Sequence, residues 1–180
     1  MKNAIYTLIV MLLTISCSSY HPPVRQEPVK DFHVAADVEK VWKGLIRFFG
    51  EYNIPIENME HGSLFIKTKP VDLKSSFGGT TLAGKKVPIR NEWCDCGSGK
   101  MANVWKSETR ILLSFNIILE KFGPSRTKVT VNTFFEGVML GKRNLYSSGY
   151  DKVIQLKCIS TGQMEAKLVS YLKNYALTAK

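Results

Sequence analysis

Two long stretches of alternating apolar and polar residues constrain the fold of this chain more than any other feature. The alternating apolar positions of the first stretch, which begins at Arg110, are Ile111, Leu113, Phe115, Ile117 and Leu119. The second stretch has Val129, Val131, Thr133 and Phe135 on one face. A period of two residues predicts a β-strand with one buried face. Residues 123–126, with Gly123 and Pro124, predict a turn and therefore an antiparallel hairpin.

Two other segments have the periodicity of amphipathic helices. After Asp37, which is placed to cap a helix, apolar residues fall at Val38, Val41, Trp42, Leu45, Ile46, Phe48, Phe49 and Tyr52. This spacing predicts a helix of about four turns that ends near Gly50. Near the end of the chain the apolar positions are Met164, Leu168, Tyr171, Leu172 and Tyr175. They predict a second helix over about residues 160–177.

The remaining segments give weaker signals. Residues 29–34 predict a short strand, and residues 54–59 and 63–68 predict a hairpin around a turn at 60–62. Residues 70–107 are rich in glycine and show little periodicity, so we expect at most one short strand there, near residues 86–93. A long segment of this kind is either functional or mobile.

The order of these elements predicts one domain of the α+β class. The chain has 180 residues, of which 44% are hydrophobic and 22% charged, a composition typical of a globular protein. We expect residues 29–180 to form a single helix-grip domain, in which a curved antiparallel sheet packs on the long C-terminal helix.

A resemblance to a known family supports this expectation. At residues 31–42, where a strand runs into a helix with Val41-Trp42 near its start, the chain resembles the opening of the START-like superfamily. Among exported lipoproteins, the layout of residues 29–177 resembles one domain of the BamC-type accessory lipoproteins of the outer-membrane β-barrel assembly machinery. That family has two such domains, and this chain has room for one.

The first sixteen residues have the layout of a secretion signal. A short positive start at Lys2 precedes an apolar run of twelve residues, 4–15, and small polar residues follow. A helix that spans a bilayer needs about 20 apolar residues. The run is therefore too short for an anchor, and we expect residues 1–16 to be a cleaved signal peptide.

The end of this segment, Ile15-Ser16-Cys17, resembles the lipobox of bacterial lipoproteins, although Thr14 stands where that family prefers Leu, Val or Ile. The resemblance implies that Cys17 is lipidated and becomes the N-terminus, and that Ser18 directs the protein to the periplasmic face of the outer membrane. Several acyl chains on one residue anchor stably. Residues 17–28 would then be an extended tether. The alternative is an ordinary secreted protein that is cut near residues 16–19 without gaining a lipid.

The charge of the chain is basic. Its formal net charge is +10, and removal of residues 1–16 takes away Lys2 and no acid, which leaves 24 basic and 15 acidic residues and a net charge of +9. Such a balance favours nucleic acid, anionic lipid or an acidic partner. An exported protein meets little nucleic acid, so we expect none as a partner. The basic residues are scattered, and a solvated surface explains most of them.

The three remaining cysteines predict a disulfide, because disulfides persist in an oxidising compartment. Cys94 and Cys96 are too close in sequence for a comfortable mutual bond, so we expect Cys158 to pair with Cys96, or with Cys94 as the alternative. Closing this loop would stabilise the fold by about 4 kcal/mol. A zinc site requires four Cys or His ligands at recognisable spacing, and the histidines lie far from the cysteines. We therefore expect no metal.

Catalytic motifs are also missing from the sequence. Residues 79–86 match the spacing of a phosphate-binding loop, but Lys86 replaces the Ser or Thr that holds magnesium. His33 lies in a predicted strand and His61 in a turn, and neither is next to a nucleophile. We predict neither an enzymatic activity nor a cofactor.

Two functional hypotheses remain. In the first, the protein is a non-enzymatic scaffold in envelope assembly, held to the membrane by its lipid, and it touches a protein partner through residues 70–107, with Trp93 and Trp105 as contacts. In the second, a cavity between the sheet and the last helix binds an apolar ligand or lipid. The expected lining residues are Leu113, Phe115, Ile117, Val131, Phe135, Leu168 and Tyr171. A filled core favours the first hypothesis, and a continuous cavity of several hundred Å³ favours the second.

Overall fold

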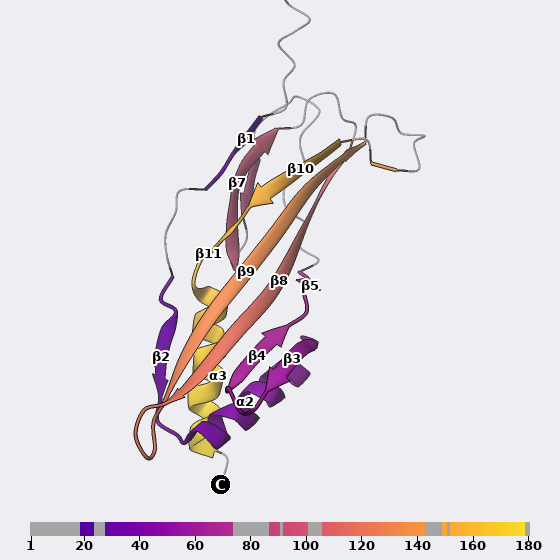
Figure 1. Ribbon diagram of the computed structural model, residues 1–180. Helices are drawn as coiled ribbons and strands as arrows, with labels where there is room; N and C mark the ends of the chain where they lie inside the picture. Colours follow the sequence, from indigo (N-terminus) through magenta and orange to yellow (C-terminus); the bar gives the residue numbers. More distant parts are fainter. Residues whose placement is uncertain are drawn as a thin grey trace, which may run out of the picture.

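The computed structural model describes residues 19–23, 28–73, 87–90, 92–100, 106–142, 149–150 and 152–178. Within these ranges the chain forms two α-helices and two antiparallel sheets, which confirms the predicted α+β class. The body is elongated, and the C-terminal helix lies at the opposite end from the N-terminal strand (Figure 1). No helix of the described ranges has the length and apolar content needed to cross a membrane.

The larger sheet is built on the predicted hairpin. Its two central strands, β8 (Lys106–Lys121) and β9 (Thr127–Lys142), have 16 residues each and extend beyond the predicted stretches. The strand order is β10-β9-β8-β4-β3. Strand β2 pairs with the start of β9, and β5 pairs with the middle of β8 at Leu112 and Leu113. The bounds of these five strands are Lys152–Lys157 (β10), Phe65–Thr68 (β4), Ile56–Glu60 (β3), Asp31–Val34 (β2) and Val71–Asp72 (β5).

Both helices begin and end near the predicted positions. Helix α2 (Val38–Glu51) begins at Asp37, whose Oδ1 accepts a hydrogen bond from the Lys40 backbone N at 2.8 Å. Its end is marked by Asn53, which takes a left-handed conformation with φ 52°. Helix α3 (Gln163–Thr178) begins three residues after the predicted start. The two helices pack closely, because a side-chain carbon at Gly44 would lie only 2.9 Å from Tyr175 Cδ1.

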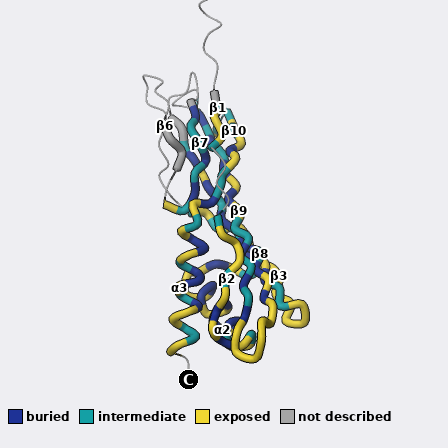
Figure 2. The backbone as a smooth tube through the Cα atoms, turned by 90° about the vertical axis from the view of Figure 1, so that its left-hand side faces the viewer, coloured by how far each residue is buried: buried dark blue, intermediate teal, exposed yellow. Residues whose placement is uncertain are grey.

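The smaller sheet contains β1 (Ser19–His21), β6 (Val87–Arg90), β7 (Cys94–Lys100) and β11 (Ile159–Ser160). Strand β7 is central and pairs with the other three. Figure 2 shows α3 and β7 on the same side of β9, at successive positions along its length. One face of the long hairpin is therefore covered by helices at one end and by the smaller sheet at the other, with a junction between them.

This sheet corrects the prediction for residues 70–107. We expected at most one short strand, but β5, β6, β7 and the start of β8 lie in that segment. The sequence of β7, CDCGSGK, lacks the β-branched residues and alternation that indicate strands, and its conformation is fixed by backbone pairing along both edges. Gly97, with φ 79°, allows β1 to approach, since a side-chain carbon there would lie 2.0 Å from the His21 carbonyl oxygen.

Strand β1 also changes the interpretation of the expected tether. Residues 19–21 of that segment pair with β7, and the Tyr20 hydroxyl donates a hydrogen bond to the Lys157 carbonyl oxygen at 2.9 Å. The same hydroxyl accepts one from the Lys157 backbone N at 2.7 Å. Part of the expected tether therefore belongs to the folded body.

Candidate functional site

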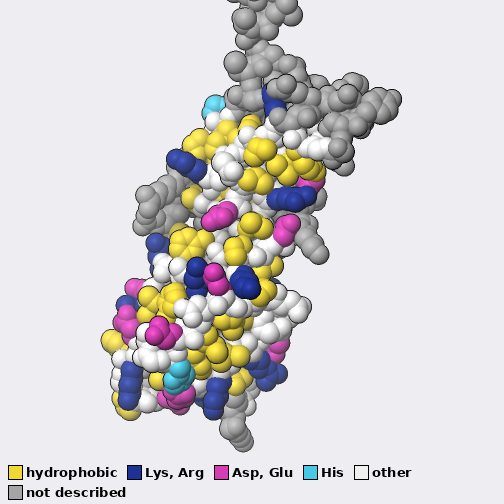
Figure 3. All heavy atoms as spheres, turned by 45° about the vertical axis from the view of Figure 1, so that its right-hand side comes forward, with side chains coloured by type: hydrophobic (Ala, Val, Ile, Leu, Met, Phe, Trp, Pro, Cys, Tyr) yellow, Lys and Arg dark blue, Asp and Glu magenta, His cyan; other side chains and the backbone are white. Residues whose placement is uncertain are grey.

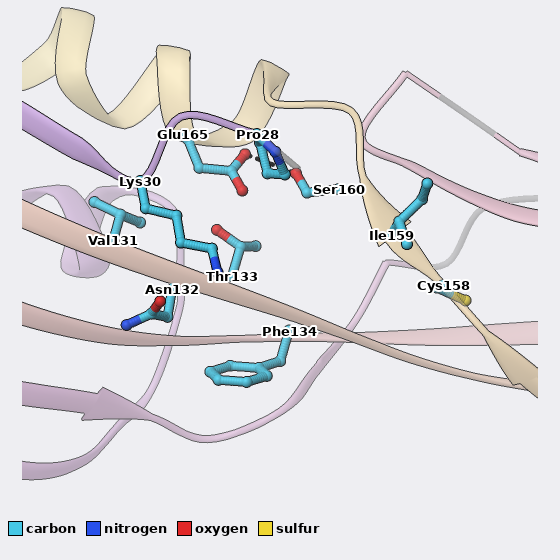
Figure 4. A pocket seen from close by; sticks show the side chains of 10 residues that line it. All are labelled: Pro28, Lys30, Val131, Asn132, Thr133, Phe134, Cys158, Ile159, Ser160 and Glu165. Atoms are coloured by element: carbon cyan, nitrogen blue, oxygen red, sulfur yellow. Dashed lines mark hydrogen bonds between the residues drawn. The ribbon is translucent and has the colours of Figure 1, made fainter. Parts of the chain in front are cut away.

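A disulfide joins Cys96 of β7 to Cys158, the residue between β10 and β11. This is the first of the two predicted pairings, and it links residues 62 positions apart. It ties the smaller sheet to the edge of the larger one near the junction. Figure 4 shows Cys158 at the border of a pocket in that region.

Cys94 keeps its thiol and is fully buried. Its Sγ lies 3.9 Å from the Sγ of Cys96. Burial, together with the nearby charge of Asp95, raises the pKa of the Cys94 thiol to about 12. Because the thiolate is the reactive form of cysteine, Cys94 is a poor nucleophile at neutral pH. The three cysteines therefore have a structural role in the resting fold.

The residues expected to line a ligand cavity instead fill the core. Phe115, Ile117, Val131 and Leu168 are fully buried, Leu113 is 2% exposed and Phe135 is 7% exposed. All six belong to one hydrophobic cluster. Tyr171 lies at the edge of that cluster, with its ring centroid 5.2 Å from that of Phe48. Val131 also borders the junction pocket, and Tyr171 borders a surface depression where α2 meets α3.

Of the expected partner contacts, only Trp93 lies in the described residues. Its side chain is half-buried and packs against the core, and the Lys167 ammonium lies 5.2 Å from the ring centroid. The Trp93 carbonyl oxygen accepts a hydrogen bond from the Thr161 backbone N at 3.0 Å. Trp105 and the predicted lipidation site Cys17 lie outside the described residues.

The pocket at the junction has a volume of about 180 Å³. We call it the junction pocket, and its lining residues are Pro28, Lys30, Val131, Asn132, Thr133, Phe134, Cys158, Ile159, Ser160 and Glu165. They come from the segment before β2, from β9, and from the chain that leads into α3 (Figure 4). Sequence reasoning missed this site because its members are distant in sequence and share no motif.

A buried carboxyl group closes one side of the junction pocket. Glu165, in the first turn of α3, is 2% exposed. Ser160 Oγ donates a hydrogen bond to Glu165 Oε2 at 2.8 Å and accepts one from the Gly162 backbone N at 3.0 Å. A carboxylate in the first turn also interacts favourably with the helix dipole. The Ser160–Glu165 pair therefore secures the start of α3 against the end of the smaller sheet.

Thr133 faces the same pocket from β9. It belongs to the inward-facing series of that strand, and its buried Oγ1 has no hydrogen-bond partner within the described parts of the chain. Figure 4 places its side chain between Lys30 and Glu165. A small polar cavity of this kind is suited to ordered water or a small polar molecule. It is smaller than the usual ligand pocket of about 300 to 1,000 Å³.

A wider, open depression adjoins the junction pocket. It has a volume of about 540 Å³ and shares Pro28 and Ser160 with that pocket. Its other lining residues are Val29, Phe32, Thr161, Gly162, Gln163 and Ala166. The expected cavity residues do not line it, so it lies outside the sheet-to-helix interior in which an apolar ligand was expected.

The histidines considered as catalytic or metal-binding candidates lie apart. His61 Nε2 is 3.2 Å from a Glu39 carboxylate oxygen in an exposed pair, and the His33 ring lies 4.8 Å from that of Phe122. In the described ranges, no three His, Cys, Asp or Glu side chains gather in a way that could hold a metal ion.

No protein-family model matches this chain, and no curated protein sequence matches it either.

Proposed function

We propose that this chain is an outer-membrane lipoprotein, facing the periplasm, that acts as a non-enzymatic scaffold or interaction module in the cell envelope. The signal-like segment and Cys17 support the location. The observation that carries the function is the filled core, because the side chains expected to surround an apolar ligand pack against one another. We further propose that the end of the fold with α2 and α3 is related to the helix-grip arrangement.

The open face of the larger sheet supplies the surface for a protein partner. The helices and the smaller sheet cover one face of the β8–β9 hairpin, and the other face carries Ile118, Phe134 and Val153 at 37%, 46% and 58% exposure. Figure 3 shows hydrophobic side chains interspersed with charged ones along the body. An apolar surface with a polar surround is typical of protein interaction sites.

Mass spectrometry of the protein, extracted mildly from its own membrane, tests the location and the absence of a ligand. The denatured mass is expected to show the loss of residues 1–16 and added acyl mass, and the Cys17→Ala variant is expected to lack that mass. The native spectrum is expected to contain no stoichiometric small molecule. An unprocessed N-terminus would contradict the location, and a bound apolar molecule would favour the carrier hypothesis.

Site-specific photo-crosslinking in cells tests the interaction face. A photoreactive residue at Phe134 is expected to form one discrete adduct with an envelope protein. Ile46, on the exposed side of α2 and 37% exposed, is the matched control position and is expected to form none. Equal adducts at both positions, or none at Phe134, would contradict the assignment of this face.

A further inference from the structure

A gap interrupts one edge of β9, and it lies at the junction pocket. Strand β8 pairs along the whole of β9, so β2 and β10 share the other edge. There β2 pairs with residues 127–130 and β10 with residues 136–141. Within the described chain no strand pairs with residues 132–135 on that edge, since the segment after β10 joins the smaller sheet. The edge of a sheet exposes backbone donors and acceptors that an extended peptide can use.

Thr133 directs its backbone N–H and C=O into this gap. It stands opposite Phe115 of β8, whose N–H donates instead to Thr68 Oγ1 at 2.9 Å. In an antiparallel pair the backbone groups of both residues point toward each other or away from each other, so those of Thr133 point away from β8. Val131 has the same direction, since its N donates to the Lys30 carbonyl oxygen at 2.8 Å. Among the described residues, neither backbone group of Thr133 has a hydrogen-bond partner.

The wall of the pocket that faces Thr133 carries a buried carboxyl group. Glu165 is 2% exposed, and its Oε2 accepts the hydrogen bond from Ser160 Oγ at 2.8 Å. Within the ranges that the structure describes, no basic residue forms an ion pair with Glu165. Figure 4 shows its carboxyl group directed toward the Thr133 side chain. A buried carboxylate is stabilised strongly by a cationic group that donates a hydrogen bond to it. The pocket therefore favours a cationic donor.

We propose that the junction pocket binds the amino-terminal residue of an extended peptide from a partner protein. The ammonium group of that residue donates to the Glu165 carboxylate and to Thr133 Oγ1, the buried oxygen that has no partner among the described residues. The first carbonyl oxygen of the peptide accepts a hydrogen bond from the Thr133 N–H. A volume of about 180 Å³ holds one small residue. Capture of an amino-terminal ammonium and addition of a strand to a sheet edge are both established modes of peptide recognition.

The open depression beside the pocket provides the path for the rest of the peptide. It has a volume of about 540 Å³ and shares Pro28 and Ser160 with the pocket. Its walls include Val29, Phe32 and Ala166, which favour apolar side chains at the second and third positions of the peptide. This continuity favours a peptide over a free amino acid. The proposal adds a second contact to the proposed interaction module, and it uses neither the lipid nor the open sheet face.

Amide exchange of the full-length protein, followed by nuclear magnetic resonance, tests the proposal without a variant. The probe is Ala-Leu-Ala-amide with a free amino terminus, and its matched control is the same peptide acetylated at that terminus. With saturating free peptide we expect the Thr133 amide to exchange about tenfold more slowly, because it gains a hydrogen bond. The Val131 amide already donates to Lys30 and is expected to stay unchanged. The acetylated peptide is expected to leave both amides unchanged.

Two variants test the side chains by calorimetry. Glu165→Gln is expected to weaken binding of the free peptide about tenfold and to remove its preference over the acetylated one. Glu60→Gln is the matched control, because Glu60 accepts a similar bond from Ser63 at 2.9 Å on the surface, and it is expected to bind like the wild type. Thr133→Val keeps the shape of the side chain without Oγ1 and is expected to weaken binding about fivefold.

Several outcomes would overturn the proposal. Equal binding of the free and acetylated peptides would exclude recognition of the ammonium group, and equal exchange of the Thr133 amide with and without peptide would exclude pairing at the gap. Alanine that binds as tightly as the tripeptide would make the pocket a site for a free amino acid. Absence of all binding would leave ordered water as the occupant. Photo-crosslinking on the open sheet face reports the proposed function separately, so that failure of either proposal is seen by itself.

Discussion

Gly137 of β9 lies directly against the disulfide: a side-chain carbon at this position would come within 3.0 Å of Cys158 Sγ and 3.1 Å of Leu156 Cβ. The backbone of β9 therefore packs directly against the Cys96–Cys158 disulfide. Any residue larger than glycine would displace either β10 or the link to the smaller sheet. A glycine in the middle of a long strand is otherwise unfavourable, and here its lack of a side chain has a clear use.

Gly137→Ala is expected to lower the free energy of unfolding by about 1 to 3 kcal/mol, because added volume in a packed site forces neighbours to move. Urea unfolding followed by circular dichroism measures the change. Gly62→Ala is the control, since no atom lies within 4 Å of the corresponding position. Equal effects of the two substitutions would contradict the packing role of Gly137.

The disulfide is expected to contribute more to the free energy of unfolding than the packing at Gly137 does. Cys96→Ser/Cys158→Ser opens a loop of 62 residues, and the chain-entropy relation gives a loss of about 4 kcal/mol. Unfolding in denaturant, with and without reductant, measures it. The reductant should destabilise the wild type strongly and leave the double variant unchanged. A wild type that is insensitive to reductant would contradict this prediction.

The raised pKa of the Cys94 thiol should make the free energy of unfolding depend on pH in the alkaline range. Its folded-state pKa, about 12, lies above the value of about 8.5 expected in the unfolded chain. Below pH 8.5 the thiol is protonated in both states, and its effect on stability is constant. Between pH 8.5 and 12 the unfolded state loses its proton first, so the free energy of unfolding should fall as pH rises. Cys94→Ala should lack this component of the slope in pH-dependent urea unfolding.

The long hairpin and both helices could be predicted because burial imposes a regular pattern on their side chains. Val129 and Val131 alternate with polar residues since one face of β9 is buried, and Asp37 marks the start of α2 through its side-chain oxygen. Strand β7 gives no such signal, because it contains Gly97 and Gly99 and no β-branched residue. Backbone pairing and the disulfide of Cys96 hold it in place.

The junction pocket could not be predicted for a different reason. Lys30, Thr133 and Glu165 line one pocket because β11 ends and α3 begins beside the same part of β9. No local sequence pattern indicates this arrangement. The disulfide was predictable as a choice between two pairings, since the rule against a bond between neighbours leaves Cys158 as the partner. Cys94 and Cys96 point to the same face of β7, so selecting Cys96 required the register of β7 against β11, in which Ser160 pairs with Cys94 and Ile159 with Asp95.

Tyr20→Phe is expected to loosen β1. The hydroxyl donates to the Lys157 carbonyl oxygen and accepts from the Lys157 backbone N, and its removal leaves both groups without that partner. We expect the free energy of unfolding to fall by about 1 to 3 kcal/mol, and amide exchange to be faster in β1 than in β8. Tyr52→Phe, which keeps the ring against Phe48 and Lys167, is the control. Unchanged exchange in β1 would show that strand pairing alone holds it.

The Ser160–Glu165 hydrogen bond is expected to matter because it is buried. Ser160→Ala deprives a carboxyl group that is 2% exposed of a bond of 2.8 Å, and a loss of about 1 to 3 kcal/mol should follow. Ser63 and Glu60 form a similar bond of 2.9 Å on the surface, so Ser63→Ala is a matched control and should change stability little. A double-mutant cycle with Glu165→Gln isolates the pair by urea unfolding. Coupling energies that are equal in the two pairs would contradict the role of burial, since water can replace the lost partner only at the exposed site.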